Sequence, residues 1–267
     1  ASTIDVADYR KTRNHVRGTV SKLSPYITRG VISLPEVRDA VLTRHSFGAA
    51  EKFIQELAWR EYWQRVWEAK GEEIFTDLRF VRADWEHDAL VPAITDAQTG
   101  IAVIDQAVAE LSDTGYMHNH ARMWVAMLAC NVARAHWFNM SRWLYYHLLD
   151  GDLASNTLSW QWVAGTNAGK RYVAHQSLIN ACSDSEQTGT ILDRPRAEVG
   201  TGAVPATLAT SVPFSYQTTY PTSDSLPSLT GEVYLYSPWT LDADWRGGEA
   251  AAPDATRVLV IEPRWFD

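Results

Sequence analysis

The sequence predicts an all-α fold for residues 1–199 of a chain of 267 residues. Apolar residues recur in this part every three or four positions, which is the spacing of one buried helix face. Runs that alternate apolar and polar residues, as half-buried strands do, are not found before residue 200, and neither is a GxGxxG motif after a strand. We therefore expect a helical domain over 1–199, a linker over 200–230 and a short strand-containing tail over 231–267.

The composition fits a protein with a large core and an aromatic site. Hydrophobic residues make up 46% of the chain, and nine of its twelve tryptophans lie between residues 59 and 162, which indicates a large core, an aromatic ligand or both. Two cysteines, Cys130 and Cys182, provide no disulfide framework. No apolar run has the length of a membrane span or a signal peptide, so we expect a cytoplasmic protein without membrane contacts.

Charge is distributed unevenly along the chain. The net charge of -8 argues against indiscriminate nucleic-acid binding, but three basic and eight acidic residues lie beyond residue 199. The segment 10–22 holds six basic residues, counting His15, and no acidic one. A local anion site is therefore permitted.

A helix is predicted to start at Ser24 and Pro25, and its N-terminus could bind an anion. Serine is a preferred N-cap and proline suits the first helical position, because its missing N–H is not needed there. The hydroxyl groups before it, together with Lys22, would lie beside the positive end of the helix, a place that suits a phosphate or pyrophosphate. An ordinary capped helix is the alternative interpretation.

A long helix is predicted over 49–70, ended by Gly71. Its expected buried stripe consists of Phe53, Ile54, Leu57, Ala58, Tyr62, Val66 and Trp67. Glu56, Arg60 and Trp63 form a neighbouring face at the same spacing, with Trp59 close to it. These side chains could line a cleft, or Glu56 and Arg60 could be a plain surface ion pair.

After an irregular connection over 72–98, helices are predicted over 101–111, stopped by Gly115, and over 117–135. The polar residues at the start of the second helix are His118, Asn119, His120 and Arg122. A zinc site is a weak interpretation of the two histidines, because residues two apart point to different sides of a helix and no third ligand is evident. We expect a hydrogen-bonding role, with Arg122 as a candidate partner of Asp150.

The stretch 150–162, DGDLASNTLSWQW, combines two carboxylates, an amide and two indoles. Residues 141–149 have helical spacing, so Asp150 falls where that helix should end, and Gly151 can supply a left-handed turn. A carboxylate there faces the negative end of the helix dipole and requires a cation. The stretch could be a metal loop, a polar capping turn or a ligand clamp. The oxygen pattern of a calcium loop is missing, which argues against the metal loop.

The last part of the chain changes character. Residues 201–230 are rich in Thr, Ser and Pro and indicate an extended linker, and 232–237 and 257–262 have strand composition. The second run is apolar throughout, which is typical of a strand buried on both faces. It either docks on the helical domain or opens an α/β domain.

Four segments together resemble the FAD-binding helical domain of the DNA photolyase/cryptochrome family. They are TVSKLSPYITRG at 19–30, ELAWREYW at 56–63, TGYMHNHARM at 114–123 and DGDLASNTLSWQWVAG at 150–165, in the family's order and at similar separations. The resemblance implies a bent FAD inside a helical bowl and blue-light-driven electron transfer to pyrimidine dimers in damaged DNA. The alternative is a cryptochrome-like photoreceptor that signals through a protein partner, and a third option is a remnant domain that binds flavin weakly.

The resemblance also implies residues for the cofactor. In this chain the pyrophosphate would be held by Ser21, Lys22, Leu23 and Ser24, with Tyr9 nearby. Val20 and Lys22 stand where the family has Thr and Arg, so one hydroxyl and a bidentate fork are absent. The remaining implied FAD contacts are Phe53, Glu56, Arg60, Asn119, Arg122, Asp150, Asp152 and Asn156, and no metal is implied.

Catalytic and DNA-binding roles follow from the same resemblance. The implied catalytic residues are Glu56, Asn119, Asn156, Trp160 and Trp137, the last two as an electron relay. Trp85 is near the expected third tryptophan but out of register. The implied lesion contacts are Trp59, Arg60, Met123 and Trp162, and His120 and His175 are candidates for proton transfer at a (6-4) lesion.

The chain departs from the family pattern in three places. The family has an α/β antenna-binding domain ahead of the helical one, whereas here a strand-like run, RVLVIEPRWF, lies at the C-terminus and resembles the first strand of such a domain. This suggests a permuted order with an antenna domain or subunit as partner. His120 stands where Arg is common, and the sequence after Gly165 differs from the family's lesion pocket. The flavin site is therefore better supported than the DNA site.

Overall fold

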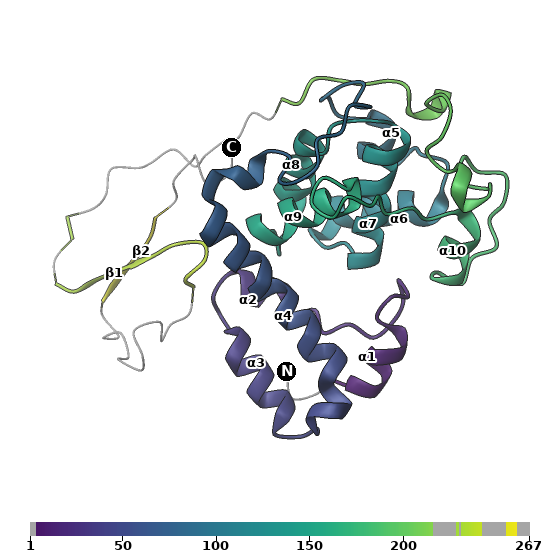
Figure 1. Ribbon diagram of the computed structural model, residues 1–267. Helices are drawn as coiled ribbons and strands as arrows, with labels where there is room; N and C mark the ends of the chain where they lie inside the picture. The colour runs from purple at the N-terminus through teal and green to yellow at the C-terminus, as the bar shows by residue number, and fades with distance from the viewer. Residues whose placement is uncertain (1–3, 216–227, 230, 242–254, 261–267) are drawn as a thin grey trace.

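The computed structural model describes residues 4–215, 228–229, 231–241 and 255–260 (Figure 1). Its α-helices are α1 (Val6–Thr12), α2 (Ser24–Thr28), α3 (Leu34–Leu42), α4 (Phe47–Lys70), α5 (Pro92–Thr95), α6 (Ala102–Thr114), α7 (Asn119–Met127), α8 (Trp137–His147), α9 (Leu153–Ala164) and α10 (Gln176–Ala181). Short 3-10 or π-helical turns are η1 (Gly71–Phe75), η2 (Leu128–Val132), η3 (Arg196–Glu198) and η4 (Ala206–Leu208), and the strands are β1 (Val233–Tyr236) and β2 (Thr256–Leu259). The predicted all-α class is confirmed.

The main core lies among α6, α7, α8 and α9. Trp124 and Trp137 are both fully buried in it. The helix predicted over 117–135 is two elements, because α7 passes into the π-helical turn η2, whose five residues are all buried. Gly200 crosses this turn so closely that a Cβ atom there would lie 2.3 Å from the carbonyl oxygen of Asn131. The chain after α10 thus packs directly against the core at the turn η2.

Helix α4 connects the N-terminal helices to this core (Figure 1). Phe53 packs in a small cluster with Tyr9, whereas Trp67 packs against Ile74 further along the helix. The predicted stripe is wrong at Ala58 and Tyr62, which are exposed, because α4 changes its packing partner between its two ends. Its predicted end at Gly71, with a φ of 55°, is confirmed.

Of two other predicted helix termini, one is confirmed and one is wrong. Gly115 ends α6 in the left-handed conformation, as predicted. Helix α2 begins at Ser24 itself, with Leu23 at the N-cap position and no side-chain capping bond, so the predicted serine cap is wrong. Pro25 is found within the first turn, as expected.

Residues 200–215 pack on the helical body. Leu208 is fully buried in the main core, and Val212 pairs with Leu90 through two backbone hydrogen bonds of 2.8 and 3.0 Å. The segment is thus held at its apolar positions despite its Thr- and Pro-rich composition. The remainder of the predicted linker falls mostly outside the described residues, and the domain boundaries stay predictions.

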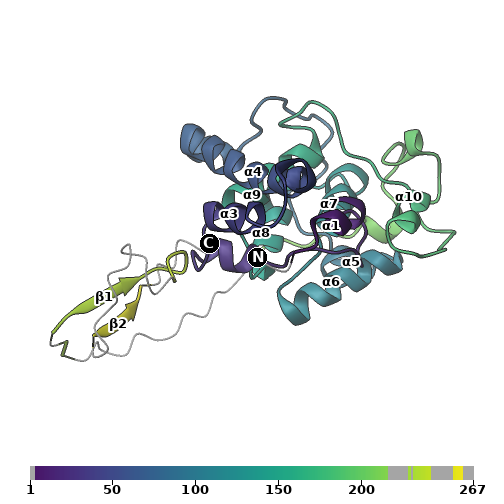
Figure 2. The same ribbon diagram turned by 90° about the horizontal axis from the view of Figure 1, so that it is seen from below.

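Both predicted strands are found, and they pair in parallel with Val233 opposite Thr256. The predicted burial of the second strand on both faces is wrong in its described part, since Leu259 is 51% and Val260 42% exposed. The pair lies beside the helical body in both views, so helices do not cover it (Figures 1 and 2). Residues 261–267 of the tail lie outside the described residues.

The helices of the described residues also bear on membrane association. None of them combines the length and the apolarity needed to cross a bilayer.

We expect Leu208→Ala to lower the free energy of unfolding by about 2 to 5 kcal/mol, because it leaves a cavity in the core. The neighbouring exposed residue provides the control: Thr207→Ala should change stability by less than about 0.5 kcal/mol. Denaturant unfolding of both variants measures the difference. Equal stability of the two would show that residues 200–215 do not belong to the folded unit.

Candidate functional site

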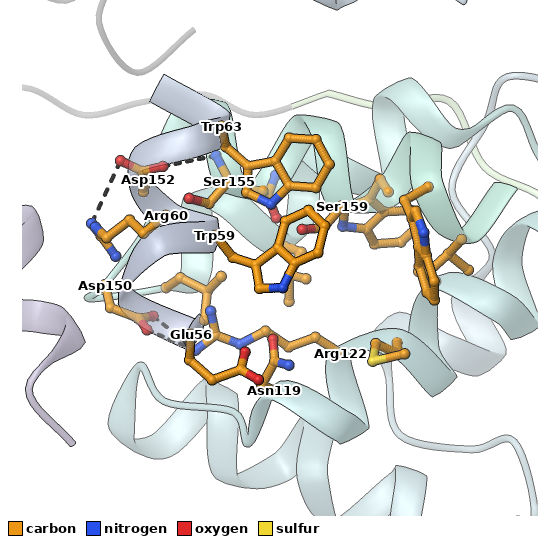
Figure 3. Close-up of a pocket in the computed structure, with 18 of the residues that line it drawn as sticks. Glu56, Trp59, Arg60, Trp63, Asn119, Arg122, Asp150, Asp152, Ser155 and Ser159 are labelled. Carbon is orange, nitrogen blue, oxygen red and sulfur yellow. Dashed lines mark hydrogen bonds and ion pairs between the residues drawn. The ribbon is translucent and has the colours of Figure 1, made fainter. Parts of the chain in front are cut away.

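A cavity of about 370 Å³ opens between α4, α7 and α9 (Figure 3). The predicted residues that line it are Glu56, Trp59, Arg60, Asn119, Arg122, Met123, Asp150, Asp152, Asn156, Trp160 and Trp162. They come from three separate stretches of the chain, and the fold brings them to one place. Their roles remain predictions at this point.

The cavity is bordered by an ion pair between α7 and the turn before α9. Nη2 of Arg122 lies 2.9 Å from both carboxylate oxygens of Asp150, which is buried, while Nε of Arg122 donates to the carbonyl of Met117. The predicted partnership of Arg122 and Asp150 is confirmed. Nη1 of Arg122 has no hydrogen-bond partner among the described residues and is available to a ligand.

The turn that carries Asp150 differs from the prediction. Helix α8 ends at His147, and Gly151 does not adopt a positive φ, so the predicted left-handed turn is wrong. A Cβ atom at Gly151 would lie 3.0 Å from the carbonyl oxygen of Tyr145 and 3.1 Å from that of Leu148. The glycine is thus needed for a close approach of two backbone segments, which cannot be read from local sequence.

Asp152 connects the cavity to α4. One carboxylate oxygen accepts the backbone N–H of Ser155 at 2.7 Å and thereby caps α9. The other accepts from Gln64 at 2.5 Å and lies 3.5 Å from Nη2 of Arg60. The same guanidinium donates to the hydroxyl of Thr28 at 2.5 Å. Arg60 is therefore part of the site and not of a surface pair with Glu56.

Asn156 is held in a defined orientation. Its Nδ2 donates to the carbonyl of Ser141 at 2.9 Å, and its Oδ1 accepts no hydrogen bond from the described residues. Oδ1 is therefore the atom that can accept an N–H from a ligand. Together with Arg60 and Asp152 this residue also lines a second cavity of about 1090 Å³ on the side of α2 and α8.

Aromatic side chains border the cavity. The indole of Trp59 is 53% exposed and stacks on Trp63 with centroids 5.6 Å apart, and both project over the cavity (Figure 3). Trp162 is 40% exposed, whereas Trp160 is buried and belongs to the main core. The cavity thus has solvent-facing indoles at its edge and a buried indole in its wall.

Several predicted cofactor residues do not line this cavity. Tyr9 and Phe53 pack edge to face at 5.2 Å in the N-terminal cluster. The four residues of the predicted phosphate loop, Ser21, Lys22, Leu23 and Ser24, are also absent from the linings of both cavities. Lys22 has a φ of 51°, a conformation that costs about 1 kcal/mol or more outside glycine. Its ammonium lies 5.7 Å from the ring of Tyr116, and the guanidinium of Arg122 lies 6.0 Å from the same ring.

Trp137, His120 and His175 also lie outside both cavity linings. Trp137 is fully buried in the core. Nε2 of His120 lies 3.4 Å from the hydroxyl of Tyr172, and Nδ1 of His175 is buried without a hydrogen-bond partner in the part of the chain that the structure describes.

Other residues that line the cavity were not predicted from the sequence. They are Asn14, Ala126, Leu144, Leu148, Ser155, Ser159 and Val163, whereas Trp63, which also lines the cavity, was expected on the same face as Glu56 and Arg60. Ser155 and Ser159 lie on the helix face of Asp152 and Asn156, so helical spacing contained a signal for them. Asn14 had no such signal, because it reaches the cavity from a loop.

The two histidines at the start of α7 have structural contacts. Nδ1 of His118 accepts the backbone N–H of His120 at 3.1 Å, and its Nε2 is buried without a hydrogen-bond partner in the described structure. Burial lowers the pKa of His118 to about 4, helped by the nearby His120 and Arg122. The ring is therefore neutral at pH 7 and caps the helix next to the cavity.

Comparison with known proteins finds a family model that matches the helical domain. The family model described as "FAD binding domain of DNA photolyase" matches residues 53–193, just over half of the chain. The chain belongs to the DNA photolyase/cryptochrome family. The resemblance in four sequence segments is thereby confirmed, and FAD is the cofactor of the matched domain.

Individual photolyases and cryptochromes resemble the chain at a moderate level. A deoxyribodipyrimidine photo-lyase of Streptomyces griseus is 33% identical over 62% of this chain and 37% of its own length. A cryptochrome DASH of Natronomonas pharaonis is 31% identical over 76% of this chain and 44% of its own. The solved cryptochrome of Synechocystis sp. PCC6803 matches with a TM-score of 0.59 and 28% identity over 67% of this chain and 39% of its own. The chain thus spans about 40% of the length of these relatives.

The side chains of the cavity fit a flavin chemically. Arg122 Nη1 offers a donor and Asn156 Oδ1 an acceptor, and the buried indole of Trp160 lies in the same wall. Flavin rings carry carbonyl oxygens and ring N–H groups along one edge, so donors and acceptors placed in this way match them. The carboxylate of Asp150 is already neutralised by Arg122 and does not repel an electron-rich ring.

We expect Asp150→Ala to lower the free energy of unfolding by about 3 kcal/mol, because it leaves the charge of Arg122 unpaired in a largely buried place. The double variant Arg122→Met with Asp150→Leu removes both charges and should recover most of that loss. Chemical unfolding of the three proteins measures it. A double variant as unstable as the single one would contradict a charge-pairing role.

Stability should also fall as the pH drops from 6.5 towards 4. In this window the unfolded chain protonates His118 while the folded chain does not, so unfolding is favoured by on the order of 3 kcal/mol at the lower limit. His118→Asn keeps an acceptor oxygen for the cap but does not titrate, so its stability should depend less steeply on pH. Thermal unfolding between pH 7 and 4 provides the measurement, and identical slopes would exclude His118 as a source.

Proposed function

We propose that the chain is the FAD-binding part of a blue-light-driven photolyase that repairs pyrimidine dimers in DNA. The observation that carries this proposal is a cavity with a neutralised ion pair and an oriented amide within it and two exposed indoles at its edge. The ion pair and the amide suit a flavin ring, and the two indoles suit a base displaced from a DNA stack.

In this proposal Arg122, Asn119 and Asn156 would hold the flavin ring. Arg122 Nη1 would be free to donate to a ring carbonyl, and Asn156 Oδ1 would accept a ring N–H, because its Nδ2 already donates to the carbonyl of Ser141. Asp150 keeps Arg122 in position, and Asp152 fixes the start of α9, on which Asn156 lies. FAD, when bound, supplies the light absorption and the one-electron chemistry.

The segment 21–24 would hold the pyrophosphate. Lys22 adopts a left-handed backbone, and strain of this kind outside glycine is concentrated at ligand-binding loops. The ammonium of Lys22 replaces the guanidinium usual in the family, so it would act as a point charge on the phosphate. Tyr9 and Phe53 would support this side of the site from the N-terminal cluster.

The lesion would enter at the indoles of Trp59 and Trp162. Extruding a base from the DNA stack costs a few kcal/mol, and stacking on an aromatic wall offsets about 1 to 3 kcal/mol per base. Met123 adds apolar contact, and the carboxylate of Glu56, 42% exposed and 3.5 Å from Arg13, can accept N–H groups of the base edge. Arg60 connects this side to Asp152.

Trp160 and Trp137 would form the electron relay, and we assign its third position to Trp85. The ring of His136 lies 5.4 Å from that of Trp137 and 5.0 Å from that of Trp85, so the three rings form a series of contacts. The guanidinium of Arg82 stacks on Trp85 at 3.9 Å. Trp160 shares the buried core with Trp137 and reaches the cavity wall.

The proposal extends to the remainder of the chain. The helical domain would span 1–199, and the parallel pair β1–β2 would belong to an α/β unit or dock an antenna domain, because parallel strands are typical of α/β layers. Both cysteines are free, which supports a reducing, cytoplasmic location.

A cryptochrome-like photoreceptor is the second candidate. It is favoured by the net charge of -8, which opposes binding to DNA phosphates, and by the similarity to cryptochrome DASH. Such a protein would keep the flavin and the tryptophan series and would signal through a protein partner.

Repair of a dimer-containing oligonucleotide under blue light tests the proposal. The purified full chain, loaded with FAD, should restore the pyrimidines in light and not in darkness. Bound flavin with photoreduction but without repair would favour the photoreceptor. A protein that takes up no added FAD would contradict both candidates.

We expect Trp59→Ala and Trp162→Ala each to weaken binding of the dimer by about 5- to 150-fold, the equivalent of losing about 1 to 3 kcal/mol of stacking energy. Their FAD content should stay unchanged, because the ion pair of Arg122 and Asp150 and the oriented amide of Asn156 are retained. Tyr26→Ala removes an equally exposed aromatic residue outside both cavities and serves as the control. Titration of a labelled dimer oligonucleotide measures the affinities. Equal binding by Trp59→Ala, Trp162→Ala and Tyr26→Ala would contradict a role of the two indoles in binding the lesion.

A further inference from the structure

A nearly buried carboxylate is hydrogen bonded to a tryptophan of the core. Oδ1 of Asp77 accepts Nε1–H of Trp137 at 2.8 Å. The side chain of Trp137 is fully buried, and that of Asp77 is 11% exposed. Asp77 follows the turn η1, sixty residues before the start of α8, so this contact is a product of the fold. Neither cavity uses it.

The charge of Asp77 is not compensated by a strong cation. Among the described residues neither lysine nor arginine lies within ion-pairing distance of it, and its one such neighbour is Nε2 of His136 at 3.8 Å. Burial lowers the pKa of His136, and Arg82 lowers it further, although Asp77 and Asp88 raise it. The imidazole is therefore largely neutral at pH 7, and the indole N–H is the closest donor to the carboxylate.

This arrangement is costly if its purpose is packing alone. A buried indole N–H is satisfied by any backbone carbonyl, which carries no net charge. A carboxylate taken out of water without a paired cation loses favourable solvation. The fold therefore places a negative charge at Nε1 of Trp137 where a neutral acceptor would serve for stability.

A negative charge at this atom has a specific effect on oxidation of the indole. Removal of one electron creates a radical cation, whose positive charge is stabilised by an adjacent carboxylate in a low-dielectric environment. Oxidation also makes the N–H strongly acidic, and the 2.8 Å hydrogen bond already leads to an acceptor.

We propose that Asp77 is the proton acceptor for Trp137 during light-driven electron transfer. Trp137 gives one electron to the oxidised indole of Trp160, whose own electron has gone to the photoexcited flavin. The Nε1–H bond then breaks, and the proton forms an O–H bond with Oδ1 of Asp77, leaving a neutral indolyl radical and a neutral carboxylic acid. Return of the electron reverses both transfers. This inference rests on the relay of the proposed function.

The consequence is a longer-lived charge separation. A neutral radical next to a neutral acid has no Coulomb attraction that draws the electron back, and the proton must return before the indole is restored. Asp77 would thereby slow recombination at the second step of the relay.

The test uses the full chain loaded with FAD in a Trp85→Phe background, which halts the oxidised site at Trp137. After a laser flash, time-resolved infrared spectroscopy should detect a new carboxylic-acid C=O band that rises together with the visible absorption of the deprotonated indolyl radical. In Asp77→Asn the band should be missing, the radical should stay protonated, and it should decay several-fold faster. Asp88→Asn removes an exposed carboxylate beside His136 and should behave like the parent protein.

Two further measurements keep the test independent of folding and of FAD. Asp77→Glu restores a carboxylate and should recover the band. In the FAD-free protein the indole N–H signal of Trp137, assigned with Trp137→Phe, should move upfield in the nuclear magnetic resonance spectrum of Asp77→Asn and stay in place in Asp88→Asn.

The outcomes separate this inference from the proposed function. An indolyl radical that forms without a carboxylic-acid band in the parent protein would overturn the role of Asp77 while leaving the relay intact. Absence of any indolyl radical after the flash would overturn the relay and the role of Asp77 together.

Discussion

The ion pair of Arg122 and Asp150 is the interaction on which the site depends. It joins α7 to the turn between α8 and α9, and backbone carbonyls of the same turn accept hydrogen bonds from Thr28 and Arg29 at the end of α2. Helix α9 starts from this turn, so the pair also determines where Asn156 and Trp160 lie. A buried carboxylate without its guanidinium would destabilise the turn itself, and the cavity would lose its wall.

Much of the site could be predicted from the sequence because it depends on rules that act between residues close together in the chain, such as helix ends and helical periodicity. The position of Asp150 after a helical run required a cation, and Arg122 supplied it. Helical periodicity placed the buried residues of α7, and Gly71 and Gly115 ended their helices for conformational reasons. Three of the four family-like segments converge on this cavity, because each lies on or next to a packed helix, whereas no residue of the segment 19–30 lines it.

The errors lie where tertiary contacts override a local rule. Gly151 avoids two carbonyl oxygens instead of turning left-handed, and Ala58 and Tyr62 are exposed because α4 packs against different partners at its two ends. The position of Trp85 next to His136 and the bond from Trp137 to Asp77 join residues about 50 to 60 positions apart. Spacing along one chain carries no signal for such pairs.

The parallel pairing of β1 and β2 has a consequence for how copies of this protein behave together. Parallel strands cannot be closed by a tight hairpin, and two strands alone are marginally stable in water. Each strand of the pair lies at an edge of this two-stranded sheet, and sheet edges can act as templates for additional strands. We therefore expect changes in this small sheet to alter solubility at high concentration without altering the chemistry of the helical body.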